Sequence, residues 1–261
     1  NESLLSYLKP HVKDFGDENG ETVLRHLLGT ENETEQLSDG IKDKLVDALG
    51  NCKILDPACG SGAFPMGVLL QMVHLLAKLD PNNKRWKQTN LDKAKADLER
   101  AQAMEDDKIR ETAVTSAEDR ILYIQESFAE NRHELDYTRK LFLIENCIYG
   151  VDIQQIAIQI SKLRFFISLI VEQKIDDSKR NRNVLPLPNL ETKSIAANTL
   201  IGLKKPDQLM IGSEGVAKLE SELLQIRKQI FYARKWQAKK ELKSKEKGKR
   251  TELKNQLQKA G

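Results

Sequence analysis

The sequence is short of cysteine, histidine and proline, and it has no long hydrophobic run. Its three cysteines (Cys52, Cys59 and Cys147) contain no C-x-x-C pair, which favours a reduced, cytoplasmic setting over a disulfide scaffold. No apolar stretch approaches the ~20 residues that cross a membrane, and the first residues lack the basic and apolar segments of a secretory signal. The four histidines are scattered, without an H-E-x-x-H motif or a Cys/His ligand set, so no metal site is expected.

Common catalytic signatures are also absent. There is neither a G-x-x-x-x-G-K-[ST] phosphate loop nor a G-x-S-x-G nucleophile elbow. Cys59 lies in a glycine-rich turn, but no histidine is placed to activate it, and we therefore interpret it as a packing residue. These absences argue against a phosphate-loop enzyme and against a serine or cysteine hydrolase.

Charge is distributed unevenly along the chain. Residues 204–261 hold 16 Lys and Arg against 7 Asp and Glu, a net charge of +9, whereas the whole chain carries +3, which leaves −6 for the rest. A basic arm on an acidic body fits a polyanionic partner. A solvated helical face explains the same composition, and the sequence leaves both interpretations open.

The most informative stretch is ILDPACGSGAF, residues 54–64. Apolar residues lead to Asp56, a turn of small residues follows, and helical periodicity runs over about residues 64–79. This is the strand–turn–helix pattern of a nucleotide-binding α/β unit, whose ligand lies beyond the carboxyl end of the strand. Gly60 and Gly62 allow a sharp turn and the close approach of a ligand. The spacing is not G-x-G-x-x-G, and the acid suits a ligand with a positive charge or hydroxyl groups better than a pyrophosphate.

A second strand–acid–helix pattern begins at Cys147. The apolar residues 147–153 predict a strand closed by Asp152, and residues 156–171 predict a helix. An acid in this position of a Rossmann-like fold holds two ribose hydroxyls. The apolar side chains that recur at helical spacing in this helix are Ile156, Ile160, Leu163, Ile167 and Ile170.

Residues 192–197 predict a third strand, which ends at Asn198-Thr199-Leu200. An asparagine in this place can hydrogen-bond the amine of an adenine, and Leu200 can lie against the ring. Helical patterns surround the strands: a lead-in over residues 1–52 and a charged insertion over residues 81–139. The core would then comprise residues 53–80 and 140–203.

The last segment, residues 204–261, predicts a helical or coiled-coil arm. Apolar residues from Val216 to Ala233 alternate spacings of three and four, as in a short heptad seam. Leu253 and Leu257 are placed to return along this seam after a bend at Gly248. A hairpin that packs on itself and an arm that contacts DNA phosphates both fit this pattern.

Taken together, three of these motifs resemble one family. The run Asp56-Pro57-Ala58-Cys59-Gly60-Ser61-Gly62, followed by Phe64, resembles the first S-adenosylmethionine (AdoMet) motif of DNA methyltransferases that methylate amino groups. Residues 150–153 and 198–200 resemble the second and third motifs. Over about residues 50–203 the chain is similar to the N6-adenine-specific methylases of type IIG restriction–modification systems. This implies an α/β fold: a Rossmann-like class I AdoMet-dependent methyltransferase core with a partial parallel sheet, a helical insertion and a C-terminal helical arm.

The resemblance also implies a cofactor, AdoMet, and a partner, double-stranded DNA. Asp56 and the backbone of residues 57–62 would face the methionine part of AdoMet. Asp152 would hold the ribose hydroxyls and Ile153 would pack on the adenine. Asn198, with Thr199 and Leu200 beside it, would bind the adenine amine.

Two family elements are missing. No Asn/Asp-Pro-Pro-Tyr/Phe motif, which in the family holds the flipped target adenine, occurs in the chain, and neither does the upstream Tyr/Phe-Thr-Pro element. We therefore expect no catalytic residue here. The chain would be a fragment, ending within a polar helical stretch at residues 259–261. It would be the cofactor-binding part of an adenine-specific DNA methyltransferase that is inactive by itself.

Two other functions compete with this one. The first is a non-catalytic DNA-binding or scaffold module whose working surface is the basic arm. The second is a methyltransferase that acts on RNA or protein. Oligomeric state stays open, because the heptad seam can close within one chain or between two.

Overall fold

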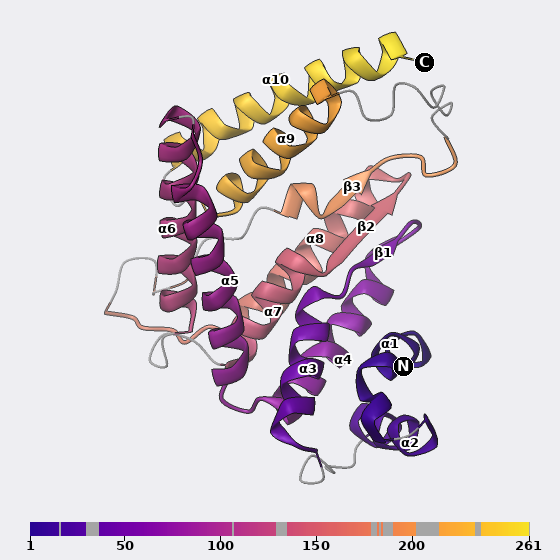
Figure 1. Cartoon of the computed structure of the whole chain (residues 1–261). Helices are drawn as coiled ribbons and strands as arrows, with labels where there is room; N and C mark the ends of the chain where they lie inside the picture. The colour runs from indigo at the N-terminus through magenta and orange to yellow at the C-terminus, as the bar shows by residue number, and fades with distance from the viewer. Residues whose placement is uncertain are drawn as a thin grey trace. The chain divides into compact units, whose positions relative to one another are not determined.

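The computed structural model describes residues 1–15, 17–29, 37–105, 107–128, 135–178, 182, 184, 190–201, 214–232 and 236–260 (Figure 1). The chain divides into two compact units. Unit 1 comprises residues 1–185 and 193–197, and unit 2 comprises residues 186–192 and 198–261.

Unit 1 alternates helices with short strands. Its helices are α1 (Glu2–Leu8), the 3-10 helix η1 (Lys9–Phe15), α2 (Asp17–Leu28), α3 (Asp39–Asn51), α4 (Ala63–Leu79), α5 (Lys84–Gln102), α6 (Asp107–Ser127), α7 (Leu135–Asn146) and α8 (Gln155–Ile170). Its strands are β1 (Ile54–Asp56), β2 (Ile148–Asp152) and β3 (Ser194–Ala196). The helical character predicted for residues 1–52 and 81–139 is confirmed by α1–α3 and by α5–α6.

The described strands form one parallel sheet in the order β1-β2-β3. Asp56 is in register with Gly150 on β2, and Asp152 is in register with Ala196 on β3. The prediction of an α/β fold with a parallel sheet is confirmed, and so is the expectation that two acids end neighbouring strands. Both carboxylates therefore lie at the same edge of the sheet.

One face of this sheet is covered by helices. Helices α4 and α8 contact each other as well as the strands, so they lie on the same side of the sheet, and Figure 1 shows α8 running along β2 and β3. Ile148 and Ser194 face this layer and are buried. Side chains alternate between faces, so Leu55 and Ile195 point the other way. They are 62% and 44% exposed.

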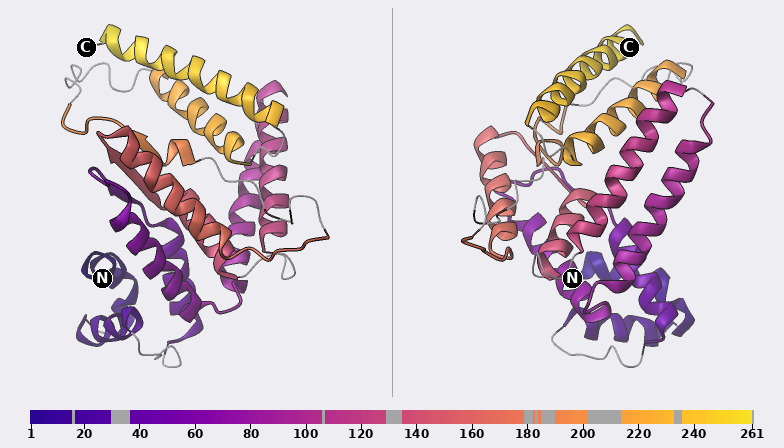
Figure 2. Two further views of the ribbon diagram at one scale, coloured as in Figure 1. Left: turned by 180° about the vertical axis from the view of Figure 1, so that it is seen from behind. Right: turned by 90° about the vertical axis from the view of Figure 1, so that its left-hand side faces the viewer.

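Aromatic packing attaches the helical insertion to the body of unit 1. Helices α5 and α6 lie side by side, as both views in Figure 2 show. The buried ring of Trp86 on α5 lies 5.7 Å from the ring of Phe142 on α7 and 6.2 Å from that of Phe128, measured between centroids. Aromatic contacts of this kind add to the apolar area that the rings bury. The excursion between the two acids is thus fixed to the core at its first turn.

Helix α8 buries a different face from the one its apolar spacing marks. The side chains packed inside are Ile158, Ser161, Phe165 and Leu169. The regularly spaced set is largely outside: Ile156, Ile160, Leu163 and Ile167 are 42–65% exposed. Because apolar side chains lie on both of these sides of α8, periodicity alone cannot choose which side faces the sheet.

Unit 2 contains the 3-10 helix η4 (Leu190–Thr192) and a pair of long helices, α9 (Glu214–Tyr232) and α10 (Trp236–Ala260). Gly215 lies beside Gln256, and Arg227 pairs with Glu246 at 2.9 Å, so the two helices run antiparallel. Helices α9 and α10 therefore form a helical hairpin, which is one of the two arrangements that the sequence left open. The predicted bend at Gly248 is wrong, because α10 continues through it from Trp236 to Ala260. Ala233 of the predicted seam lies outside the described residues.

Within the part of the chain that the structure describes, no helix has both the length and the apolarity to span a membrane.

A matched pair of substitutions tests which face of α8 is buried. Phe165→Ala removes a side chain that is 3% exposed and should lower the free energy of unfolding of unit 1 by about 3–5 kcal/mol. Ile167→Ala, where the side chain is 51% exposed, should cost about 1 kcal/mol or less. Urea unfolding followed by the fluorescence of Trp86, in a Trp236→Phe background, measures both. Equal losses would contradict the observed orientation of the helix.

Candidate functional site

The turn after β1 is held in shape by its own backbone. The amide of Ala58 donates to Oδ1 of Asp56 at 3.1 Å, and the amide of Gly62 donates to the carbonyl of Cys59 at 2.8 Å. Gly60 and Gly62 have φ values of +53° and +81°, in the left-handed region that glycine enters without strain. Helix α4 starts directly after Gly62. The sequence therefore folds here into a tight turn, with Asp56 at its base.

The same turn is fastened to the end of β2. The amide of Gly60 donates to Oδ2 of Asp152 at 2.9 Å, and the amide of Cys59 donates to the carbonyl of Val151 at 2.9 Å. The other carboxylate oxygen of Asp152 accepts from the amide of Gln154 at 2.8 Å. Asp152 thus connects the first turn to the start of the second helix, and its carboxylate position is fixed by backbone groups on both sides.

Two glycines are required by close packing around this turn. A Cβ on Gly62 would lie 2.4 Å from Oγ of Ser161 on α8, and a Cβ on Gly150 would lie 2.9 Å from Sγ of Cys59. At Gly60, by contrast, a Cβ would meet nothing within 4 Å. The backbone of Gly60 therefore borders open space, where a ligand can come close to the chain.

Cys59 is a packing residue, as its sequence context predicts. Its side chain is 6% exposed and fills the space above Gly150. Burial raises the pKa of the thiol, and the nearby carboxylates of Asp56 and Asp152 raise it further. A thiol in this setting is protonated at neutral pH and is a poor nucleophile.

The remaining residues of the predicted site differ in their surroundings. Pro57 and Ala58 are exposed and Ser61 is half-buried. Ile153 projects from the end of β2 with 69% of its surface exposed. Phe64, also exposed, lines a groove of about 540 Å³ with Leu55 beside β1. The structure brings Asp56, the turn, Asp152 and Ile153 together at the carboxyl edge of the sheet, with Phe64 as the second residue of α4.

Asn198, Thr199 and Leu200 follow β3 and are exposed. Their loop is shaped by a hydrogen bond from the amide of Leu200 to Oδ1 of Asn198, at 2.9 Å. They belong to unit 2, so their role beside the two acids stays a prediction.

Three contributors to this site escaped the sequence argument: Ser161, Gln154 and the carbonyl of Val151. Ser161 is a polar residue on an apolar helix, which is the only sign that something specific packs there. The two backbone groups leave no mark in sequence at all.

The chemistry of this edge favours a polyhydroxylated ligand with a cationic or neutral reactive group. Two carboxylates repel phosphates and attract positive charge, and carboxylate oxygens accept hydrogen bonds from hydroxyls. An exposed aliphatic side chain next to Asp152 offers a flat apolar contact. Among the described residues, no group of three or more His, Cys, Asp or Glu side chains is arranged to hold a metal ion.

Comparison with known proteins relates the second half of the chain, which includes Asp152 and Ile153, to one family. Residues 146–259 match the family model described as Eco57I restriction-modification methylase. The match starts at the end of α7, covers β2, α8 and β3, and runs through α9 and most of α10. It includes the helical hairpin, which the motifs alone do not assign to the family.

A protein of Methanocaldococcus jannaschii, provisionally named a type II restriction enzyme and methyltransferase, is 28% identical over 174 residues. The aligned region covers 66% of this chain and 10% of that protein, so the chain spans about a tenth of the length of its relative. No solved structure matches the chain. The resemblance to restriction–modification methyltransferases is thereby confirmed, and a non-catalytic DNA-binding module is not favoured.

A pair of glycine substitutions tests the packing of the turn. Gly62→Ala places a Cβ against Ser161 at a positive φ, and it should lower the free energy of unfolding of unit 1 by about 2 kcal/mol or more. Gly67→Ala, in the open middle of α4, should raise it by about 0.5–1 kcal/mol. Urea unfolding followed by Trp86 fluorescence distinguishes the two. Similar effects of both substitutions would show that the turn is not packed as described.

The cysteines provide a second test. All three thiols are buried, and burial raises the pKa of Cys147 to about 12. Because the thiolate is the reactive form, we expect a chromogenic thiol reagent at pH 8 to label the native chain about tenfold or more slowly than the urea-unfolded chain. Rapid labelling of any one cysteine in the native chain would contradict its protonated, buried state.

Proposed function

We propose that this chain is the AdoMet-binding part of a restriction–modification methylase that transfers a methyl group to the N6 atom of adenine in double-stranded DNA. One observation carries the proposal. Asp56 and Asp152 end adjacent parallel strands. A hydrogen bond from the amide of Gly60 to the carboxylate of Asp152 connects the turn after β1 to the end of β2. Ligands of open α/β sheets bind at the carboxyl ends of strands in this way.

The carboxylate of Asp152 suits a ribose. Each of its two oxygens accepts one backbone N–H, from Gly60 and from Gln154. A carboxylate oxygen has a second lone pair, so each can still accept from a hydroxyl. The two backbone donors hold the carboxylate in one orientation, which reduces the entropy that a ligand loses when it binds.

The rest of AdoMet finds matching chemistry around this carboxylate. Asp56 places negative charge near the end of β1, where it attracts the sulfonium and ammonium groups of the cofactor. Gly60 leaves room for the ligand against the backbone. The exposed side chain of Ile153 offers an apolar surface to the adenine ring. In this proposal Ser61 and Phe64 lie along the methionine end, and Asn198 binds the adenine amine.

When bound, AdoMet supplies an activated methyl group, and the protein positions it. The residues of this chain bind and orient the cofactor. No catalytic residue is assigned here, because the Asn/Asp-Pro-Pro-Tyr/Phe motif does not occur in the sequence. Specificity for adenine, and double-stranded DNA as the partner, rest on the first motif and on the family match.

Calorimetric titration of the chain with AdoMet tests the proposal. We expect saturable binding to the unmodified chain and no binding of ATP, which would place phosphates among the carboxylates. Asp152→Asn should weaken AdoMet binding about tenfold or more, because a charged hydrogen-bond acceptor is lost. Asp177→Asn, at a surface acid outside the edge, is its control and should leave the affinity unchanged.

A second pair separates binding from folding. Ile153→Ala removes an exposed side chain and should weaken AdoMet binding severalfold while the urea midpoint stays the same. Val171→Ala, also exposed but at the far end of α8, should change neither quantity. If the folded chain releases no heat with AdoMet, or if Ile153→Ala binds it as well as the unmodified chain, the proposed site is wrong.

A further inference from the structure

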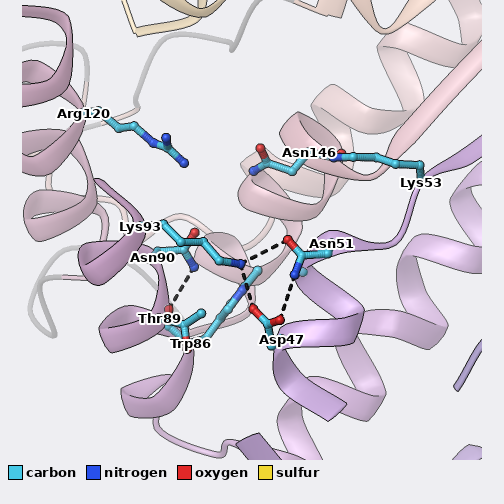
Figure 3. A pocket seen from close by; sticks show the side chains of 10 residues that line it. Asp47, Asn51, Lys53, Trp86, Thr89, Asn90, Lys93, Arg120 and Asn146 are labelled. Carbon is cyan, nitrogen blue, oxygen red and sulfur yellow. Dashed lines mark hydrogen bonds and ion pairs between the residues drawn. The ribbon is translucent and has the colours of Figure 1, made fainter. Parts of the chain in front are cut away.

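A small polar pocket lies at the opposite end of the strands from the two acids (Figure 3). Lys53 directly precedes β1, and Asn146 lies two residues before β2. Both line the pocket, together with residues from the end of α3, the first half of α5 and the side of α6. Its volume is about 70 Å³, which holds a group of a few heavy atoms and not a nucleoside.

The charged side chains that line this pocket are mostly cations. They are Lys53, Lys93 and Arg120, against the single carboxylate of Asp47. Lys93 donates to Asp47 at 2.7 Å and to Oδ1 of Asn51 at 3.1 Å, so this carboxylate is already engaged. The ammonium of Lys53 donates to the backbone carbonyl of Asn146, which is uncharged, so the positive charge of Lys53 is not neutralised by this contact.

Arg120 is only partly neutralised. Its Nη1 atom donates to Asp97 at 2.7 Å, but Asp97 also accepts from Arg100 at 2.7 Å, so one carboxylate serves two guanidinium groups. The Nε atom of Arg120 is buried and has no hydrogen-bond acceptor among the described residues. Figure 3 shows Arg120 reaching from α6 toward the space that Lys93 and Asn146 border. A buried donor on a charged group is costly unless an acceptor reaches it.

Neutral hydrogen-bonding groups complete the lining. Asn51, Thr89, Asn90 and Asn146 line the pocket together with Trp86. Thr89 donates to the carbonyl of Arg85 at 3.0 Å, and Asn90 donates to the carbonyl of Trp86 at 2.9 Å. A Cβ on Gly50 would lie 3.0 Å from Nε1 of Trp86, so glycine at this position lets the end of α3 pack closely against the edge of the buried indole.

We propose that this pocket binds a phosphate-type oxyanion, held by Arg120, Lys53 and Lys93. A planar guanidinium with a free N–H and two ammonium groups fits a tetrahedral oxyanion better than a cation or an apolar group. The anion is either free inorganic phosphate or a phosphate of a nucleic-acid backbone. This site is independent of the proposed AdoMet site, since it lies at the amino end of the same strands.

Trp86 provides a direct readout. The chain has two tryptophans, so a Trp236→Phe variant leaves Trp86 as the only indole reporter. This chain is titrated with sodium phosphate at constant ionic strength, with sodium chloride as the reference salt. We expect a saturable change in Trp86 emission with phosphate and none with chloride.

Two arginines that share Asp97 form a matched comparison. Arg120→Gln should weaken phosphate binding about tenfold, since one charge-assisted hydrogen bond is lost. Arg100→Gln changes the other partner of Asp97, is 74% exposed and lies outside the lining, so phosphate affinity should stay unchanged. Lys53→Gln, at an exposed side chain, repeats the test if Arg120→Gln lowers the urea midpoint.

The source of the anion is decided by competition. Displacement of phosphate by a short DNA duplex would assign the pocket to a backbone phosphate, and a duplex without effect would assign it to the free anion. If phosphate produces no saturable change at tens of millimolar, or if Arg120→Gln and Lys53→Gln both bind it like Arg100→Gln, the cations are an internal ion network and the proposal is overturned. AdoMet is absent from every arm, so this result does not depend on the methylase proposal.

Discussion

The hydrogen bond from the amide of Gly60 to the carboxylate of Asp152 is the contact on which the candidate site depends. It joins two segments that are 92 residues apart in sequence. The bond forms because β1 and β2 are adjacent and parallel, so that their turns emerge at the same edge. Close packing of Gly62 on Ser161 and of Cys59 on Gly150 holds the turn next to Asp152. Each of these contacts links the first βα unit to the second.

The long excursion between the two units leaves this edge intact because it is attached elsewhere. Helices α5 and α6 pack on each other, and Trp86 ties their base to Phe142 on α7. Asp80 secures the entry to the insertion: its carboxylate accepts from the amide of Trp86, and its carbonyl accepts from the buried Arg139. The insertion therefore adds a second surface to unit 1. The parallel pairing of β1 with β2 does not depend on the length of the insertion.

The two ends of the strands differ in charge. Carboxylates gather at the carboxyl ends, while Lys53, Lys93 and Arg120 gather at the amino ends. Since opposite charges attract different ligands, one sheet can serve a cationic cofactor at one end and an oxyanion at the other.

Unit 1 also has apolar side chains that stay exposed. Parallel sheets are usually covered on both sides, and here Leu55 and Ile195 remain open, as does the outer stripe of α8.

The amino-acid sequence by itself determined the local features: the strand–acid–turn pattern at Asp56, its repetition at Asp152, the helical insertion and the heptad seam of the arm. These follow from short-range properties, namely periodicity, glycine in a tight turn and apolar runs. Tertiary structure decided the rest. It selected Phe165 over Ile167 as the buried side of α8, because α8 has apolar side chains on both of these sides and its sequence does not decide between them. It carried α10 straight through Gly248, since packing against α9 outweighs the weak helix propensity of one glycine. It also brought Ser161 against Gly62, and Arg120 into the same pocket as Lys53, because contacts between distant segments exist only once the sheet and helices have assembled.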